Sequence, residues 1–391
     1  MDVPFRDLPR EPSNDRHFQP VPDEMEVPPV APVTVTAREA FTDAGAAPEA
    51  FAPAPGVEPD GGPALTPAPS PAKPRPASFR ADRFSFAGTE YAYRLYLPPG
   101  LPATASSAAA EPSTVAEKAG SPRALIVLLH GCKQDAADFA KGTDMNTLAA
   151  IDNCLVLYPE QLTKANSMRC WNWFDPAHQS RESGEPGMIA ALTRKVIAQH
   201  DVDASRVYVA GLSAGGAMAA VLASEYPDLF AAAGIHSGLP RGAAKDVISA
   251  FSAMRSGPAS RGAALKAAKD SGPMPVPVIV FHGSADKTVN PDNGGHIVDA
   301  ALQAFAASSM PLSETRIDLP DADGERIPGR GGQRSVFRAA DGRAYVESWE
   351  IDAGPHAWSG GDAGGSYTDP DGPSASAAML AFFLQHRREL H

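Results

Sequence analysis

From Ala124 onward, short apolar runs alternate along the chain with longer segments of helical periodicity. Such runs are typical of strands buried on both faces of a parallel sheet, with crossover helices between them. The expected strands are Ala124–His130, Cys154–Tyr158, Arg206–Ala210, Ala232–His236, Val276–Phe281 and Tyr345–Ile351, and the expected helices are Pro186–His200, Gly215–Tyr226, Gly295–Ala306 and Ser374–Leu384. The pattern predicts an α/β fold, a mostly parallel sheet with helices on both faces.

Two hairpins flank this alternating region. Apolar residues recur through 79–86 and 91–97, and Ala87-Gly88 between them fits a turn. Asp341-Gly342 lies between Ser335–Phe337 and Tyr345–Trp349, an arrangement typical of an antiparallel hairpin. We expect the first hairpin to lead into the sheet.

Proline marks a separate N-terminal segment. The chain of 391 residues contains 39 prolines, and 18 of them lie within residues 1–76. This segment has no sustained periodicity, so it cannot bury enough apolar surface to offset the entropy of ordering. We expect a disordered Pro/Ala-rich acidic tail over 1–76 and one folded domain over 77–391. Within that domain, residues 98–122 predict a flexible insertion, and residues 241–274 a candidate lid.

The charge of the chain excludes two classes of partner. The formal net charge is −12, whereas nucleic acids and anionic membrane surfaces require a basic patch. No apolar run approaches the roughly twenty residues of a membrane span. The N-terminus lacks the basic and apolar regions of a secretory signal. These features predict a cytoplasmic protein with no nucleic-acid partner and no membrane span.

A nucleophile motif lies between a predicted strand and a predicted helix. The string Gly211-Leu212-Ser213-Ala214-Gly215 directly follows the run Arg206–Ala210, which is the context that a nucleophile elbow requires. The flanking glycines suit a turn that is too tight for side chains. Ser213 is therefore the candidate nucleophile, and a helix-capping serine on a glycine-rich turn is the alternative.

A serine nucleophile needs a base, and the base needs an acid that orients it. Asp286 and His356 each follow a predicted strand, and His356 lies on a glycine-rich loop. Open α/β sheets build their sites at the carboxyl ends of strands. The order Ser213, Asp286, His356 matches the chain order of α/β-hydrolase triads, and Asp292 is the reserve acid.

Two backbone N–H groups are candidate donors to the oxyanion of an ester intermediate. Ala214 directly follows the nucleophile, and Cys132 lies in the loop after the run Ala124–His130. With Cys154 and Cys170, Cys132 makes three cysteines, which are too few for a disulfide framework and lack metal-ligand spacing. Hydrolysis by a serine, histidine and aspartate needs neither a metal nor a cofactor, and we expect none.

Several longer strings surround these candidate residues. They are His130-Gly131-Cys132-Lys133-Gln134, Tyr158-Pro159-Glu160, Cys170-Trp171-Asn172-Trp173-Phe174, Gly211-Leu212-Ser213-Ala214-Gly215-Gly216-Ala217-Met218, His236-Ser237-Gly238-Leu239-Pro240, His282-Gly283 with Asp286, His356-Ala357-Trp358-Ser359-Gly360-Gly361 and Gly365-Ser366-Tyr367-Thr368-Asp369-Pro370. Through these strings the chain resembles, over nearly all of residues 79–387, the polyhydroxybutyrate (PHB) depolymerase family of esterases, whose catalytic domain has an α/β-hydrolase fold. The resemblance implies that Ser213, Asp286 and His356 cleave short-chain polyhydroxyalkanoate esters, poly-3-hydroxybutyrate or its oligomers, through an acyl-enzyme.

Cysteines and tryptophans within these strings are further candidates. Cys132 and Cys170 each lie in a family-like motif, which points to a disulfide between them, with two reduced thiols as the alternative. Cys154 is expected to be a small core residue. The candidate substrate-binding residues are aromatic, with core packing as the alternative for each, and they are Trp171, Trp173 and Trp358.

Several alternatives stay open at this level. The family resemblance predicts an extracellular protein, although no signal peptide is visible. Acetyl or feruloyl esters of polysaccharides, or short-chain carboxylic esters in general, are alternative substrates because related esterases share the triad. A non-catalytic granule or partner adaptor is the alternative from another class. The sequence does not identify what the tail binds.

Overall fold

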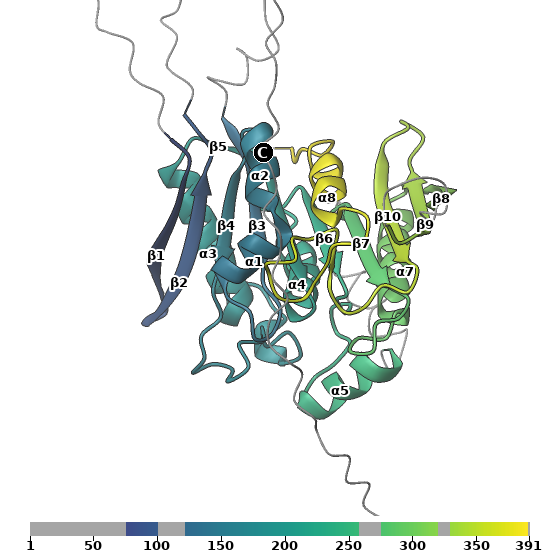
Figure 1. Ribbon diagram of the computed structural model, residues 1–391, viewed down its shortest axis with the longest axis horizontal. Coiled ribbons are helices and arrows are strands. Elements are labelled where there is room, and N and C mark those ends of the chain that lie inside the picture. The colour runs from purple at the N-terminus through teal and green to yellow at the C-terminus, as the bar shows by residue number, and fades with distance from the viewer. Residues whose placement is uncertain (1–75, 101–121, 258–274, 320–328, 390–391) are drawn as a thin grey trace, which may run out of the picture. The chain divides into compact units, whose positions relative to one another are not determined.

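A computed structural model describes residues 76–100, 122–257, 275–319 and 329–389. At its centre lies a ten-stranded sheet with the strand order β1-β2-β4-β3-β5-β6-β7-β10-β9-β8 (Figure 1). Almost all of the predicted tail over 1–76 and of the predicted insertion over 98–122 lie outside the described residues. The same holds for residues 258–274 of the candidate lid.

The six central strands run parallel to one another, as the apolar pattern predicts. Their bounds are β3 Arg123–Leu129, β4 Leu155–Pro159, β5 Val202–Leu212, β6 Ala232–His236, β7 Val278–Gly283 and β10 Ala344–Ile351. β5 begins before the predicted Arg206, because Asp203 and Ser205 continue the strand beyond its apolar run. Polar residues at a strand end are invisible to a search for apolar runs.

Antiparallel strands extend the sheet at both edges. Their bounds are β1 Ser78–Phe86, β2 Thr89–Leu97, β9 Gly332–Arg338 and β8 Ser313–Leu319. Positive φ angles at Ala87 and Gly88 form the predicted turn between β1 and β2. The sequence pattern does not predict β8, because its residues are mostly polar and almost all exposed. A charged edge strand of this kind resists pairing with other chains.

Helices cover both faces of the sheet, as predicted (Figure 1). The bounds are α1 Ala136–Thr143, α2 Met145–Ile151, α3 Gly184–Gln199, α4 Ala214–Glu225, α5 Val247–Ser256, α7 Asp292–Ala307 and α8 Ala375–Phe383. Residues of α3, α4 and α7 pack on one face, and residues of α1, α2 and α8 pack on the other. The sequence pattern misses α1 and α2, which have only 8 and 7 residues, because two turns show little periodicity.

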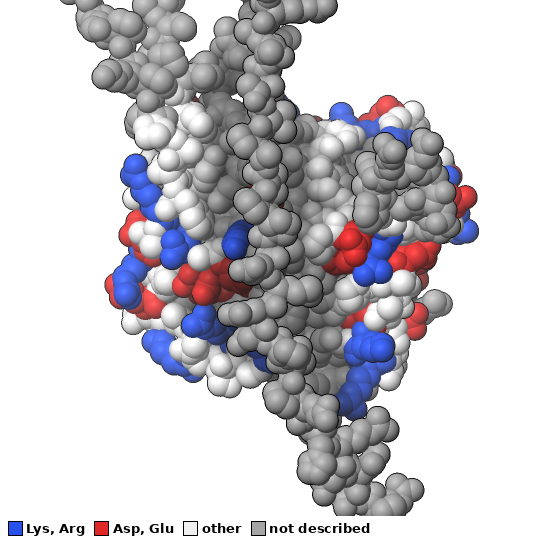
Figure 2. Space-filling model, in the orientation of Figure 1, with Lys and Arg blue, Asp and Glu red and all other residues white. Residues whose placement is uncertain are grey.

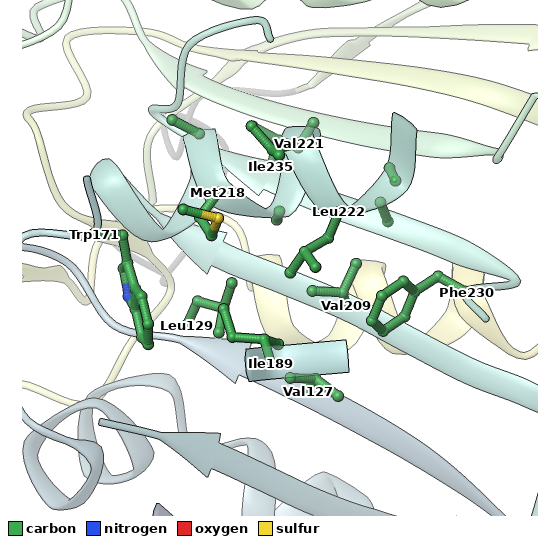
Figure 3. Packing of buried hydrophobic residues seen from close by; sticks show 14 of the residues in the cluster. Val127, Leu129, Trp171, Ile189, Val209, Met218, Val221, Leu222, Phe230 and Ile235 are labelled. Carbon is green, nitrogen blue, oxygen red and sulfur yellow. The ribbon is translucent and has the colours of Figure 1, made fainter. Parts of the chain in front are cut away.

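The core has two layers because alternate residues of each central strand point to opposite faces. Val127 and Leu129 of β3 pack with Ile189 of α3 and Met218 of α4 (Figure 3). Leu128, which lies between them in the strand, belongs to the other layer, together with residues of α8. Packing on both faces fixes the carboxyl ends of the strands relative to one another, and the loops with the candidate site residues begin there.

The surface carries charges of both signs. On the face shown in Figure 2, acidic and basic side chains of the described residues are interspersed. None of the helices within the described ranges combines the length and the apolar composition that crossing a membrane requires.

Candidate active site

Ser213 lies at the sharp turn between β5 and α4. Its backbone has φ 58° and ψ −118°, a conformation that residues other than glycine rarely adopt. The Ser213 N–H donates to the carbonyl of His236, the last residue of β6, over 2.9 Å. This bond anchors the strained turn at the carboxyl end of the parallel strands, as in a nucleophile elbow.

The glycines beside Ser213 are required by close backbone contacts. A Cβ atom on Gly211 would collide with the backbone of Gly215, and a Cβ atom on Gly215 would collide with the Leu129 carbonyl oxygen. Leu129 and Gly211 are paired in adjacent central strands, so neither backbone is free to move away. The two glycines therefore let α4 begin directly against the sheet.

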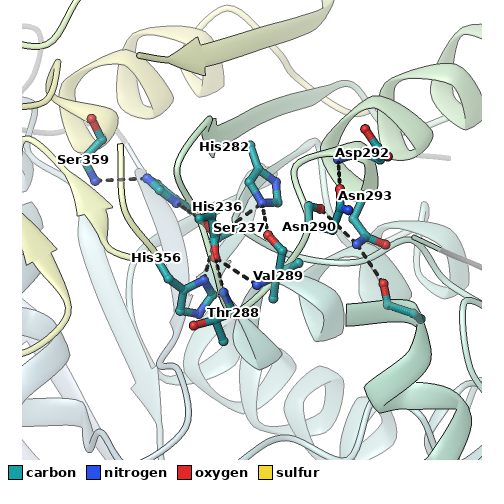
Figure 4. Close-up of polar contacts among 12 residues, drawn as sticks. His236, Ser237, His282, Thr288, Val289, Asn290, Asp292, Asn293, His356 and Ser359 are labelled. Carbon is teal, nitrogen blue, oxygen red and sulfur yellow. Dashed lines mark hydrogen bonds and ion pairs between the residues drawn. The ribbon is translucent and has the colours of Figure 1, made fainter. Parts of the chain in front are cut away.

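Asp286 and His356 are in direct contact across 70 positions of the chain. His356 Nδ1 lies 2.7 Å from Asp286 Oδ2, and Asp286 Oδ1 accepts the backbone N–H groups of Thr288 at 2.9 Å and Val289 at 2.8 Å (Figure 4). Both carboxylate oxygens of Asp286 therefore have hydrogen-bond partners. Nε2 of His356 is the ring nitrogen that remains for another partner. Asp292, the reserve acid, instead lies exposed in the first turn of α7.

The environment of Asp286 favours its charged form. Burial by itself would raise the pKa of the carboxyl, but hydrogen bonds from His282, His356 and the Val289 backbone hold the pKa well below its usual range. His282 Nε2 lies 3.4 Å from Asp286 Oδ2 and 2.9 Å from the Val289 carbonyl oxygen. An ionised carboxylate in this place can orient the His356 ring and stabilise its cation.

Ser213 and His356 line the same cavity, whose volume is about 560 Å³. Its other walls come from the turn after β3, the loop 166–174, helix α5 and the loop after β7. The structure shows no hydrogen bond between the described side chains of Ser213 and His356. The evidence that the two residues act together is that both line this cavity. Most lining side chains are apolar, which suits the acyl part of an ester.

The two predicted oxyanion donors, Ala214 and Cys132, also line this cavity. Ala214 is the first residue of α4, so its N–H has no acceptor within the helix. The turn that contains Cys132 is held by Gln134, whose Oε1 accepts the Gly131 N–H at 2.9 Å. Gln134 Nε2 donates to the Ser366 carbonyl over 2.9 Å. One buried side chain thereby connects the turn to a distant loop.

A disulfide joins Cys132 to Cys170, and both cysteines line the cavity. It connects the turn after β3 with the tryptophan-rich loop, in which Trp173 lines the cavity as expected of a substrate-binding residue. Cys154 is a buried free cysteine. The candidate acyl wall and the candidate oxyanion turn are therefore covalently linked.

The other two tryptophans proposed to bind substrate lie in the core instead. Trp171 is fully buried, and its Nε1 donates to the His130 carbonyl over 3.1 Å. Trp358 is also buried, packs edge-on against Phe139 and donates from Nε1 to Ser376 Oγ over 3.0 Å. Neither lines the cavity, so this part of the prediction is wrong. An indole ring is stably buried where its N–H finds an acceptor, and both rings have one.

Two buried histidines support the site as neutral rings. His236 Nε2 accepts the Ser359 N–H at 3.0 Å, three residues beyond His356 (Figure 4), and burial lowers the pKa of His236 to about 3. His130 Nε2 accepts the Gln161 N–H at 3.1 Å, and burial lowers the pKa of His130 to about 4. The sequence reasoning missed both, although each ends a predicted strand.

We expect acid to destabilise the protein through these two rings. An unfolded histidine has a pKa near 6.5, so between about pH 6.5 and pH 4 the unfolded chain binds more protons than the folded chain. The free energy of unfolding should therefore fall as the pH falls through this window, by a few kcal/mol per ring in order of magnitude. Below about pH 4, Asp286 adds to the loss, because its carboxylate gains a proton in the unfolded chain while the folded chain still holds it ionised. Urea unfolding measured from pH 8 to pH 4 tests this expectation, and a free energy that stays constant from pH 7 to pH 5 contradicts it.

The sequence reasoning also missed the wall that α5 contributes. Val247, Phe251 and Met254 line the cavity, and their i, i+4, i+7 spacing is a helical signal. Tyr367 and Gln134 line it too. Both lie within the family-like strings, but the sequence reasoning assigned neither of them a role.

Known proteins resemble the chain in sequence. The family model described as Esterase PHB depolymerase matches residues 91–307, which include Ser213 and Asp286 but end before His356. Poly(3-hydroxyalkanoate) depolymerase C of Paucimonas lemoignei is 35% identical over 233 residues, 58% of this chain and 53% of that protein. Feruloyl esterase B of Neurospora crassa is 36% identical over 126 residues, 32% of this chain and 42% of that protein. The chain thus spans about half the length of these curated relatives.

A solved structure resembles the chain in fold. The acetyl xylan esterase from Aspergillus awamori matches with a TM-score of 0.55 at 18% identity, covering 79% of this chain and 99% of that chain. At this identity the likeness concerns the fold alone. Together with the mostly parallel sheet and the helices on both faces, it confirms the predicted α/β-hydrolase fold.

Proposed function

Because the chain belongs to the esterase PHB depolymerase family, we propose that it is a serine carboxylic-ester hydrolase that acts on short-chain polyhydroxyalkanoates, poly-3-hydroxybutyrate or its oligomers. The observation that carries the proposal is the contact between His356 and the buried Asp286, beside a cavity that Ser213 also lines. Ester cleavage through an acyl-enzyme requires a nucleophile, a base and an orienting acid.

In the proposed reaction, His356 accepts the Ser213 proton at Nε2 while the hydroxyl oxygen attacks the ester carbonyl carbon. The carbonyl oxygen becomes an oxyanion, which the N–H groups of Ala214 and Cys132 stabilise. The imidazolium, stabilised by Asp286, then donates its proton to the departing alcohol oxygen, which is the hydroxyl end of the released hydroxyalkanoate. Water attacks the acyl-enzyme with the help of the same groups and regenerates Ser213.

The test is the release of 3-hydroxybutyrate and its oligomers from suspended amorphous poly-3-hydroxybutyrate by the purified full chain, with heat-denatured protein as the blank. We expect release by the native protein alone. If the folded protein cleaves neither the polymer nor nitrophenyl butyrate, the proposal is overturned. That outcome would favour the alternative of a non-catalytic adaptor.

Feruloyl or acetyl esters of polysaccharides are the second candidate substrates, and the relative named feruloyl esterase B favours the feruloyl ester among them. Methyl ferulate and acetylated xylan distinguish these candidates in the same assay. A preference of at least about tenfold in kcat/KM for either of them over 3-hydroxybutyrate oligomers would keep the serine mechanism and replace the substrate.

A further inference from the structure

Glu185 is a buried carboxylate that the proposed reaction does not use. It is the second residue of α3 and is 3% exposed. The hydrogen-bond partners of its carboxylate are uncharged amide groups, and burial raises the pKa of this carboxyl. A carboxylate that is buried without a paired cation destabilises a fold unless hydrogen bonds satisfy its charge. The contacts of Glu185 therefore have to offset the cost of its burial.

All three N–H donors to Glu185 belong to the segment between β4 and α3. Gln161 Nε2 donates to Oε1 over 2.5 Å, Asn172 Nδ2 donates to Oε1 over 2.6 Å, and the Asn172 N–H donates to Oε2 over 2.7 Å. Bonds this short are typical of a charged acceptor. A glutamine would fill the same space, but its NH2 group would face one of these donors. The contacts therefore require an ionised carboxylate.

Through Gln161, this carboxylate is connected to the candidate oxyanion turn. The Gln161 N–H donates to His130 Nε2 over 3.1 Å, so the proton of this neutral ring lies on Nδ1. His130 Nδ1 then donates to the Gly131 carbonyl over 2.7 Å. That carbonyl and the Cys132 N–H, a candidate oxyanion donor, belong to one peptide unit. Because a peptide unit is planar, a fixed carbonyl also fixes the direction of the N–H.

The same two residues hold the tryptophan-rich loop. Gln161 Nε2 also donates to the Cys170 carbonyl over 3.1 Å, and Asn172 directly precedes Trp173. Cys170 and Trp173 line the cavity, whereas Glu185 does not. Glu185 therefore lies outside the cavity and holds two of its walls from behind.

We propose that Glu185 is a positioning residue that orients the candidate oxyanion turn and the tryptophan-rich loop for ester cleavage. This inference rests on the proposed function. The disulfide between Cys132 and Cys170 joins the same two segments, but it connects side chains and does not set the direction of the Cys132 N–H. The contacts that begin at Glu185 supply this orientation. A small displacement of an oxyanion donor removes much of its effect on the transition state.

The test compares Glu185→Gln with Glu347→Gln in the full chain. Glu347 is a matched control because it is also a buried glutamate, pairs with Arg334 of β9 and does not line the cavity. We expect Glu185→Gln to lower kcat about 10²-fold on both nitrophenyl acetate and nitrophenyl butyrate, because both esters form the same oxyanion. KM should rise at least about threefold for the butyrate alone, because its longer acyl chain contacts the wall. Glu347→Gln should keep both constants within about twofold for each ester.

Hydrogen exchange provides a readout that does not depend on turnover. The amides of residues 160–174 should exchange at least about tenfold faster in Glu185→Gln than in the wild type, and those of β7 should not change. Gln161→Met is the second variant, since it removes one donor to Glu185 and the side-chain contact with Cys170. We expect it to lower kcat at least about tenfold, whether or not Glu185→Gln folds.

Wild-type kinetics in the folded variants Glu185→Gln and Gln161→Met, or equal losses in Glu347→Gln, would overturn the inference. A loss of kcat without faster exchange of residues 160–174 would overturn it as well. A wild-type chain that cleaves no ester would contradict the proposed function. In that case, faster exchange confined to residues 160–174 in Glu185→Gln would still show that Glu185 holds the loop.

Discussion

Replacing Ser213 by alanine is expected to lower kcat for ester hydrolysis by at least about 10⁴-fold while the fold persists. The attacking oxygen is removed, and neither His356 nor the backbone N–H groups can replace it as a nucleophile. The Ser213 backbone N–H keeps its bond to the His236 carbonyl, so we expect the free energy of unfolding to change by less than about 1 kcal/mol. The measurements are nitrophenyl butyrate turnover, covalent labelling by a fluorophosphonate and urea unfolding.

Ser237→Ala provides a matched control for this loss. Ser237 is also a buried serine with a positive φ, 47°, and it directly follows β6. Within the described ranges, the hydrogen bond recorded for its hydroxyl is with Nδ1 of the His236 ring, at 3.2 Å. We expect the Ser237→Ala variant to hydrolyse nitrophenyl butyrate within about tenfold of the wild-type rate. The fluorophosphonate should label this variant as it labels the wild type. Near-normal turnover in a folded Ser213→Ala chain would refute the assignment of the nucleophile.

Asp286→Asn is expected to lower kcat by about 10³- to 10⁴-fold, the next largest effect. The carboxylate contacts His356 Nδ1 at 2.7 Å and is held ionised by its hydrogen bonds. A neutral amide in its place cannot stabilise the imidazolium, and its NH2 group can favour the wrong tautomer of the ring. The loss should appear in kcat more than in KM, because the charged ring exists only along the reaction path. Steady-state kinetics from pH 6 to pH 9 measure both constants.

Asp292→Asn is the corresponding control, because sequence reasoning held Asp292 in reserve as the acid. Its side chain is exposed in the first turn of α7, where a lost negative charge costs less than about 1 kcal/mol. We expect wild-type kinetics from this variant. A large loss with Asp292→Asn and a small one with Asp286→Asn would reverse the assignment of the acid.

Local patterns were enough to predict the central strands, the main helices and the candidate nucleophile. Fully buried parallel strands are mostly apolar, so a run such as Val276–Phe281, most of which lies in β7, stands out in the sequence. The elbow motif is also visible locally, because strand, turn and helix follow one another around Ser213, although the contact that requires Gly215 is with the Leu129 carbonyl oxygen of a distant strand. The edge strand Ser313–Leu319 escaped prediction for the opposite reason, since its exposed face carries no apolar signal.

The sequence by itself thus determined the fold class, the strand-turn-helix around Ser213 and the set of residues able to act with it. Only the tertiary structure decided that Asp286, and not Asp292, contacts His356. It also separated Trp173, which lines the cavity, from Trp171 and Trp358, whose N–H groups found acceptors in the core. These outcomes depend on which side chains meet across the ends of different strands, and contacts between distant segments leave no periodic trace in the chain.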